Sequence, residues 1–405
     1  MAISRMKATY ERASSVLVLD TSLENIVSAG ITSYEVVLRI LTCPWQTRLW
    51  TYQEACLASN LLFKFADRAV NLKTTIGGLE DLERPMDIPD YFSLVRSYMS
   101  SRFSEHAEDY PMPAAKRFAK TMQFIIDSLA FRSTTVPSDE VICLAALLKL
   151  PVTELLKTPE DQMRPAFWVL MEYIPAEIIF ARGPKLQQPG FCWAPATFLG
   201  ITSGFATSPL TTYSKLTSAG LEVGFPGFLL TAPEQTEPKI TFRFCFRTGS
   251  ADWYLVTLPD NNPFSPTYQG EAVAWWKSFS SAKLALIEAQ SVQAPGVANA
   301  GSGTEFTHLL TEVWRVNEGT IFVKRMASVY VAKANARETE TLNFLERNAR
   351  GRTNLEDAED IDSVHLEDFE TFEDWHDRLQ EFLALQHTYH GIIAQRLEKQ
   401  VWCVD

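Results

Sequence analysis

The residues best suited to take part in a reaction lie together in one stretch of this 405-residue chain, PWQTRLWTYQEACLA, which begins at Pro44. If residues 45–58 form one helix, Trp50 and Glu54 are four positions apart and share a face. Apolar neighbours disfavour the charged form of a carboxyl group, which suits a group that exchanges a proton or stabilises a developing cation. The structural alternative is that Glu54 only pairs with Arg48 or caps a nearby backbone group.

The elements around this motif predict half of an α/β domain. A helix over residues 2–13 precedes the apolar run 15–20, which ends in Asp20, and a strand-like segment over 61–67 follows the motif. Because residues 16–19 show no polar alternation, we expect a strand covered on both faces in a parallel sheet.

Composition changes along the chain suggest four regions. Residues 1–72 carry the α/β half-domain, 73–200 are mostly helical, and 201–335 are β-rich with a flexible loop at 291–303. Residues 336–405 form an acidic helical tail with a terminal helix. The expected fold class is α+β overall.

Several helix starts can be read from capping residues. Thr32 and Glu35 have the spacing of a capping box. Ser138 is a plausible N-cap, and Asp139 and Glu140 are better explained as favourable charges at the start of that helix than as catalysts. The helices expected in the second region cover residues 114–129, 139–150 and 160–172.

The later regions show two kinds of periodicity. Residues 240–247 alternate strictly, as in a strand with one wet face, and Gly249 and Asp252 mark a hairpin into residues 253–258. Apolar residues between 366 and 379 recur every three or four positions, which is typical of an amphipathic helix.

Overall charge and cysteine spacing exclude several classes of protein. The net charge of −12 disfavours nucleic-acid binding, which needs clustered Lys and Arg. The six cysteines are widely spaced and suggest neither a zinc site nor a disulfide framework. We find no signal peptide and no run long enough to span a membrane, so we expect a soluble cytoplasmic protein.

Metal binding has little support in the sequence. His387 and His390 are three residues apart and close to Glu381, but no third ligand with recognisable spacing accompanies them. We therefore expect no metal site.

The sequence resembles the fungal heterokaryon-incompatibility (HET) domain proteins. One family block, an Arg-x-Trp-Thr-x-Gln-Glu pattern, is matched residue by residue by Arg48, Trp50, Thr51, Gln53 and Glu54. Further similarity lies in AISRMKATYERASSVLVLD, LLFKFADR, FRSTTVPSDEVICLAALL and GFCWAPATFL. The resemblance covers about the first sixty residues for the domain itself and, more loosely, the chain to about residue 230.

HET domains in turn resemble Toll/interleukin-1 receptor (TIR) domains, which are flavodoxin-like α/β folds, some of which hydrolyse NAD. The resemblance implies that residues 16–19 form the third strand and that Glu54 is the catalytic candidate, supported by Trp45 and Asp20. Its carboxylate would engage the ribose hydroxyls and stabilise the oxocarbenium-like charge that forms as nicotinamide leaves. NAD would be a substrate, and no cofactor would be bound permanently.

The sequence also departs from the family pattern. The two earlier family blocks are absent, because the chain starts immediately before the helix that should follow them. We therefore expect an amino-truncated relative in which residues 16–19 present an unpaired apolar edge and which hydrolyses little or no NAD alone.

Two functions remain open. The motif favours an effector of fungal nonself recognition, in which self-association or another incompatibility protein brings Glu54 sites together and depletes NAD, causing programmed cell death. The absent blocks favour a non-enzymatic interaction or regulatory protein, or a decayed HET fragment, in which the remaining half serves only for packing.

Overall fold

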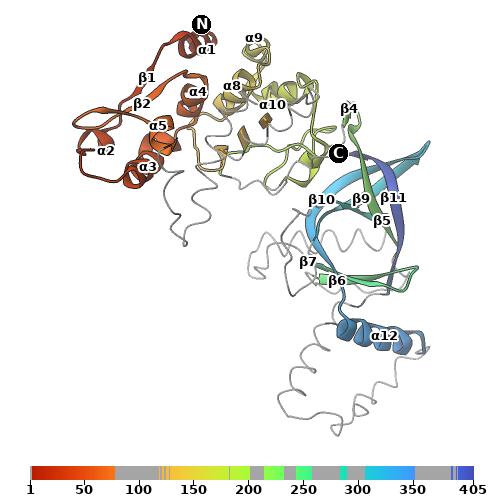
Figure 1. Ribbon diagram of the computed structural model, residues 1–405. Helices are drawn as coiled ribbons and strands as arrows, with labels where there is room; N and C mark the ends of the chain where they lie inside the picture. Colours follow the sequence, from red (N-terminus) through yellow and green to blue (C-terminus); the bar gives the residue numbers. More distant parts are fainter. Residues whose placement is uncertain are drawn as a thin grey trace, which may run out of the picture. The chain divides into compact units, whose positions relative to one another are not determined.

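The computed structural model describes residues 2–77, 118, 121–122, 125–126, 128–181, 183–200, 214–231, 243–257, 283–289, 306–351, 385, 389 and 391–405. The described chain contains both helices and strands, so the expected α+β composition is confirmed. It forms two compact units (Figure 1). Unit 1 comprises Met1–Gln187 and Ala194–Leu216, and unit 2 comprises Gln188–Trp193 and Thr217–Asp405.

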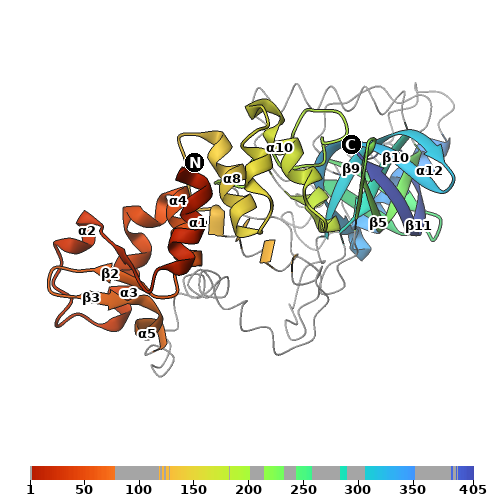
Figure 2. The same cartoon turned by 90° about the horizontal axis from the view of Figure 1, so that it is seen from above.

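The first half of unit 1 is a small sheet with helices around it. Strands β1 and β2 are parallel, with Val16 opposite Leu61, and β2 pairs with β3 in the antiparallel sense. Helix α1 packs against α4, and Figure 2 shows the two side by side. The elements are α1 (Ala2–Arg12), β1 (Val16–Val18), α2 (Thr21–Glu24), α3 (Ser33–Thr42), the short 3-10 helix η1 (Pro44–Thr47), α4 (Leu49–Leu57), β2 (Leu61–Lys64), β3 (Ala69–Asn71) and α5 (Leu72–Gly77).

The start of α3 follows the predicted cap. The hydroxyl of Thr32 accepts a hydrogen bond from the backbone N–H of Glu35 at 3.2 Å, which satisfies one of the free donors at the helix start. The Glu35 side chain pairs with Arg39 instead of returning to the cap. Helix α3 then buries Val36, Val37 and Ile40.

Strand β1 is covered on one face only, so the expectation of cover on both faces is wrong. Successive side chains of a strand point to opposite sides. Val18 is buried, whereas Leu17 is 49% exposed and Leu19 is 64% exposed. Among the described strands, β1 pairs only with β2 and therefore forms an edge of this sheet.

In the second half of unit 1, residues 137–180 are largely helical, whereas residues 183–200 form turns and loops. Helix α8 packs against α4, α9 and α10. Its N-cap is Val136 and Pro137 is its first residue, so the prediction of Ser138 as the cap is wrong; Pro at this position needs no partner for an N–H. The helix expected over 114–129 lies largely outside the described residues. The elements are α8 (Pro137–Leu147), α9 (Val152–Leu155), α10 (Glu160–Val169) and the 3-10 helix η3 (Ala176–Phe180).

Unit 2 is built on an eight-stranded mixed sheet that closes on itself. The strands follow the order β11-β6-β7-β10-β9-β8-β5-β4, and β11 also pairs with β5 and with β10. The pairing of β11 with β5 is antiparallel and joins the two sides of the sheet. The strands are β4 (Lys215–Thr217), β5 (Gly220–Thr231), β6 (Arg243–Thr248), β7 (Trp253–Thr257), β8 (Lys283–Glu288), β9 (Phe306–Asn317), β10 (Thr320–Lys333) and β11 (Ile392–Val404).

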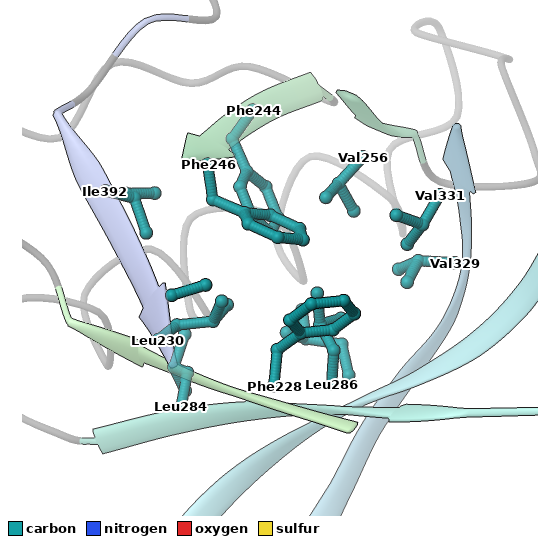
Figure 3. Close-up of a cluster of buried hydrophobic side chains, with 12 residues drawn as sticks. Phe228, Leu230, Phe244, Phe246, Val256, Leu284, Leu286, Val329, Val331 and Ile392 are labelled. Atoms are coloured by element: carbon teal, nitrogen blue, oxygen red, sulfur yellow. The ribbon is translucent and has the colours of Figure 1, made fainter. Parts of the chain in front are cut away.

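The interior of the closed sheet is filled by alternating apolar side chains. Figure 3 shows side chains of this cluster converging from several strands. Phe228 packs on Phe246 with ring centroids 5.1 Å apart. The cluster comprises Phe228, Leu230, Phe244, Phe246, Val256, Leu284, Leu286, Leu310, Val329, Val331, Ile392 and Ala394.

Helix α12 (Ala336–Gly351) follows β10 and packs against a second apolar cluster that includes Cys245 and Trp253. The indole N–H of Trp253 donates to Asn343 at 2.9 Å. Arg247 forms an ion pair with Glu346 at 2.7 Å. These contacts fix α12 to the β6–β7 hairpin.

The expectation of a helical tail over residues 336–405 is wrong at its end. Helix α12 is present, but Ile392–Val404 is strand β11. Ile392 and Ala394 are buried while Ile393 is 55% exposed, so the alternation of a strand was hidden by an apolar residue on the outer face. The expected helix over 366–379 and the expected loop over 291–303 lie outside the described residues.

No helix within the described ranges is long and apolar enough to cross a membrane.

Candidate functional site

The motif stretch is not a single helix over residues 45–58, so that prediction is wrong. Pro44–Thr47 form η1, Arg48 is extended at φ −86° and ψ 137°, and α4 begins at Leu49. At the break the carbonyl of Thr47 accepts from the N–H of Ser133 at 2.8 Å. Trp50 and Glu54 still lie one turn apart on α4.

Trp45 and Asp20 hold η1 against the sheet. Trp45 is buried and meets the ring of Phe63 edge to face, with centroids 5.4 Å apart. One Asp20 oxygen accepts from the N–H of Trp45 at 2.9 Å, and the other accepts from the N–H of Ser22 at 2.9 Å and its hydroxyl at 2.6 Å. Asp20 therefore links the end of β1 to both α2 and η1.

The electrostatics around Asp20 follow from these contacts. Burial alone would raise its pKa, but the hydrogen bonds from Ser22 and Trp45 hold the pKa below its ordinary value. Burial and the nearby charge of Asp20 raise the pKa of Cys43 to about 11. The carboxylate is charged and the thiol is protonated at neutral pH.

Thr51 and Gln53 point into the unit rather than towards solvent; both are almost fully buried. The Thr51 hydroxyl donates towards the carbonyls of Trp45 (2.5 Å) and Arg48 (2.7 Å). The hydroxyl thereby gives a hydrogen-bond donor to two backbone carbonyls, one in η1 and one at the break between η1 and α4.

Trp50 joins the motif to the helical half of unit 1. Its indole N–H donates to the carboxylate of Asp139 on α8 at 2.8 Å. Asp139, which was predicted as a favourable charge at the helix start, thus also accepts a hydrogen bond from a side chain of α4. The Arg48 side chain is exposed, and its backbone carbonyl carries its described hydrogen bonds.

Glu54 is half-buried and contacts α1. Its carboxylate accepts a hydrogen bond from the Tyr10 hydroxyl, and burial, the Glu54 charge and this bond raise the pKa of Tyr10 to about 12. The partner here is Tyr10 rather than Arg48.

Sequence reasoning missed two buried arginines and the partners of one glutamate. Glu140 lies in the first turn of α8, as predicted. Arg132 reaches the motif from the segment before α8. Glu140 is 1% exposed and pairs with Arg164 on α10 at 2.8 Å. It also accepts from the Thr197 hydroxyl at 2.7 Å and the Phe198 N–H at 2.8 Å. These interacting residues lie far apart along the chain, so no local sequence spacing predicts their contacts.

One open pocket of about 460 Å³ is described in unit 2. The hydroxyl groups of Thr248 and Ser250 on its wall hydrogen-bond to each other at 2.9 Å, and none of the motif residues lines it. The lining residues are Thr231, Thr248, Gly249, Ser250, Ile393, Ala394, Gln395 and Arg396.

The described residues contain no group of three His, Cys, Asp or Glu side chains placed to hold a metal ion. His387, His390 and Glu381 lie outside those residues. No family model, curated protein or solved structure matches the chain.

Proposed function

We propose that this chain is a HET-type protein of fungal nonself recognition and that Glu54 is its reactive carboxylate. The observation that carries the proposal is the arrangement of the Arg-x-Trp-Thr-x-Gln-Glu motif. Its Trp50 and Thr51 side chains hold the helix in place, while Glu54 remains half-buried with a neutral hydroxyl as partner. In this proposal the β1–β2 layer is part of a flavodoxin-like, TIR-like sheet.

The proposed reaction is hydrolysis of the N-glycosidic bond of NAD. Glu54 would bind the ribose hydroxyls next to the nicotinamide and stabilise the positive charge that develops on the ribose as nicotinamide leaves. Tyr10 would have to release the carboxylate for this contact. Association with a second copy or another incompatibility protein would bring two such sites together, and NAD depletion would lead to cell death.

The test is an assay of nicotinamide release by the full chain, at low and high protein concentration, with Glu54→Ala and Glu54→Gln. The matched control is Glu35→Ala, because Glu35 is a helical glutamate of the same unit whose partner is Arg39. We expect little or no release at low protein concentration, where the chain is alone, and more at high concentration, where copies associate. The release at high concentration should be lost in both Glu54 variants and persist in the control. Equal release in Glu54→Ala and the unchanged protein would remove Glu54 from catalysis.

A second function, that of a non-enzymatic interaction or regulatory protein, has its own supporting observation. Asp20, Trp45, Trp50 and Thr51 are all engaged in contacts that join elements of unit 1. If none of the proteins in the assay releases nicotinamide while Thr51→Val lowers the stability of unit 1, the motif serves packing and this second function is favoured.

A further inference from the structure

We infer that Arg132 is a positioning residue for α4 and that the HET-type module includes the segment 131–139 as well as residues 1–72. The inference rests on the proposed function only in treating α4 as the functional helix. It concerns what sets the orientation of that helix and therefore the place of Glu54.

Arg132 fills the break between η1 and α4. Its guanidinium donates to the carbonyl of Arg48 at 2.8 Å, to the Thr51 hydroxyl at 3.0 Å and to the side-chain oxygen of Gln46 at 3.2 Å. The side chain is only 5% exposed. Arg48 is the N-cap residue of α4, so its carbonyl lies where the chain enters the helix, and the guanidinium is an additional donor to it.

The guanidinium also packs on the first turn of α4. Its central carbon lies 4.8 Å from the centre of the Tyr52 ring, a distance at which a cation is attracted to an aromatic face. Tyr52 is itself fully buried. Arg132 therefore contacts both sides of the break at Arg48.

The backbone beside Arg132 caps α4. The carbonyl of Ser133 accepts from the N–H of Leu49 at 3.0 Å, and the N–H of Ser133 donates to the carbonyl of Thr47 at 2.8 Å. No side chain caps α4 at Arg48, so Ser133 supplies a partner that the helix start lacks.

A contact further along fixes the rotation of α4. Trp50 on α4 is tied to Asp139 on α8, only six residues after Ser133. One helix face is thus held by the segment 132–139, and Glu54, one turn beyond Trp50, is directed towards Tyr10 on α1. Losing the Arg132 contacts would free this rotation.

The choice of arginine is explained by the geometry of its partners. Three acceptors on different residues match the planar, forked donors of a guanidinium, whereas the ammonium group of lysine is a compact charge. We expect Arg132→Lys to behave as a partial loss and Arg132→Met as a full one.

The test is amide hydrogen exchange read by mass spectrometry on the full chain, together with the Trp50 indole N–H signal in NMR. The matched control is Arg164→Lys, which alters another buried arginine of unit 1 that belongs to the Glu140 pair. Arg132→Met should raise the exchange rate of residues 49–57 by about tenfold or more, since hydrogen bonds to a charged group are lost. The Trp50 signal should shift with it. Arg164→Lys should raise exchange in α8 and α10 but not in residues 49–57.

If Arg132→Met does not fold, Thr51→Val still tests the inference, because it removes only one of the three acceptors of the Arg132 guanidinium. Faster exchange confined to residues 44–58 in Thr51→Val and Arg132→Lys supports the inference. Uniform changes across unit 1, or none in residues 49–57, would overturn it. Nicotinamide release is measured separately. If the protein does not hydrolyse NAD but shows this local change in exchange, the enzyme proposal is wrong and the positioning role of Arg132 still holds.

Discussion

At the scale of single residues, unit 1 depends on a few buried charged groups with several partners each. Glu140 receives two hydrogen bonds from Arg164 and one each from Thr197 and Phe198. The partners come from α10 and from the segment after η3, so one carboxylate fixes three parts of the chain. Removing one member of such a pair leaves an uncompensated charge in a buried site.

Glu140→Gln should therefore lower the free energy of unfolding of unit 1 by about 3–5 kcal/mol. The measurement is urea unfolding followed by tryptophan fluorescence. Glu35→Gln is the control, because both side chains of the Glu35–Arg39 pair are at least 40% exposed; its effect should stay below about 1 kcal/mol. Equal effects of the two substitutions would contradict the structural role of Glu140.

The lowered pKa of Asp20 predicts that the stability of unit 1 depends on pH. Its folded-state pKa lies below the ordinary 3.8, so its stabilising contribution is complete above that value and is lost as the pH falls through the folded-state pKa. The difference in unfolding free energy between the unchanged protein and Asp20→Asn should be largest near pH 7 and shrink below about pH 4. Urea titrations at several pH values test this, and a constant difference down to pH 2 would contradict it.

At the scale of elements, sequence patterns predicted the features that depend on residues close together in the chain. The Thr32 cap and the hairpin between β6 and β7 came out as expected, because each depends on residues a few positions apart. The break at Arg48 was missed, since the donor that stabilises it is Arg132, which lies more than eighty residues later. The strand β11 was missed because its neighbours in the sheet, and not its own propensity, determine it.

Strand β5 offers a matched pair of glycines. A Cβ at Gly227 would lie 2.4 Å from the Leu286 carbonyl oxygen and 2.8 Å from the Trp402 ring, whereas a Cβ at Gly224 meets nothing within 4 Å. Gly227→Ala should destabilise unit 2 by about 1–3 kcal/mol or more through overpacking. Gly224→Ala should change stability by less than about 1 kcal/mol. Thermal unfolding of both variants, followed by circular dichroism, distinguishes the two sites.

At the scale of the whole molecule, both units bury apolar side chains, but they arrange them differently. Unit 1 packs short elements together and adds polar contacts between them, such as Trp50–Asp139 and Glu140–Arg164. Unit 2 encloses one continuous apolar cluster within a closed sheet. Binary alternation predicted part of that sheet from the sequence, but closure depends on pairings between distant strands that no single sequence pattern displays.

Neighbouring positions on β11 test the closed sheet. Ala394 is 3% exposed and belongs to the interior cluster, while Ile393 is 55% exposed on the outer face. Ala394→Asp should unfold unit 2, because it buries a charge without a partner. Ile393→Asp should keep the fold. Far-UV circular dichroism and protease resistance compare the two, and a folded Ala394→Asp protein would show that the interior admits water.

The place of β11 in the sheet has a consequence for biosynthesis. Leu221 near the start of unit 2 is paired with Val404, and β11 also completes the pairing of β6 and β10. On the ribosome, β5 and β6 emerge long before their partner and expose unpaired edges while translation continues. Unit 2 can therefore complete its fold only after synthesis of β11, and chaperone binding to the nascent chain should persist until that point.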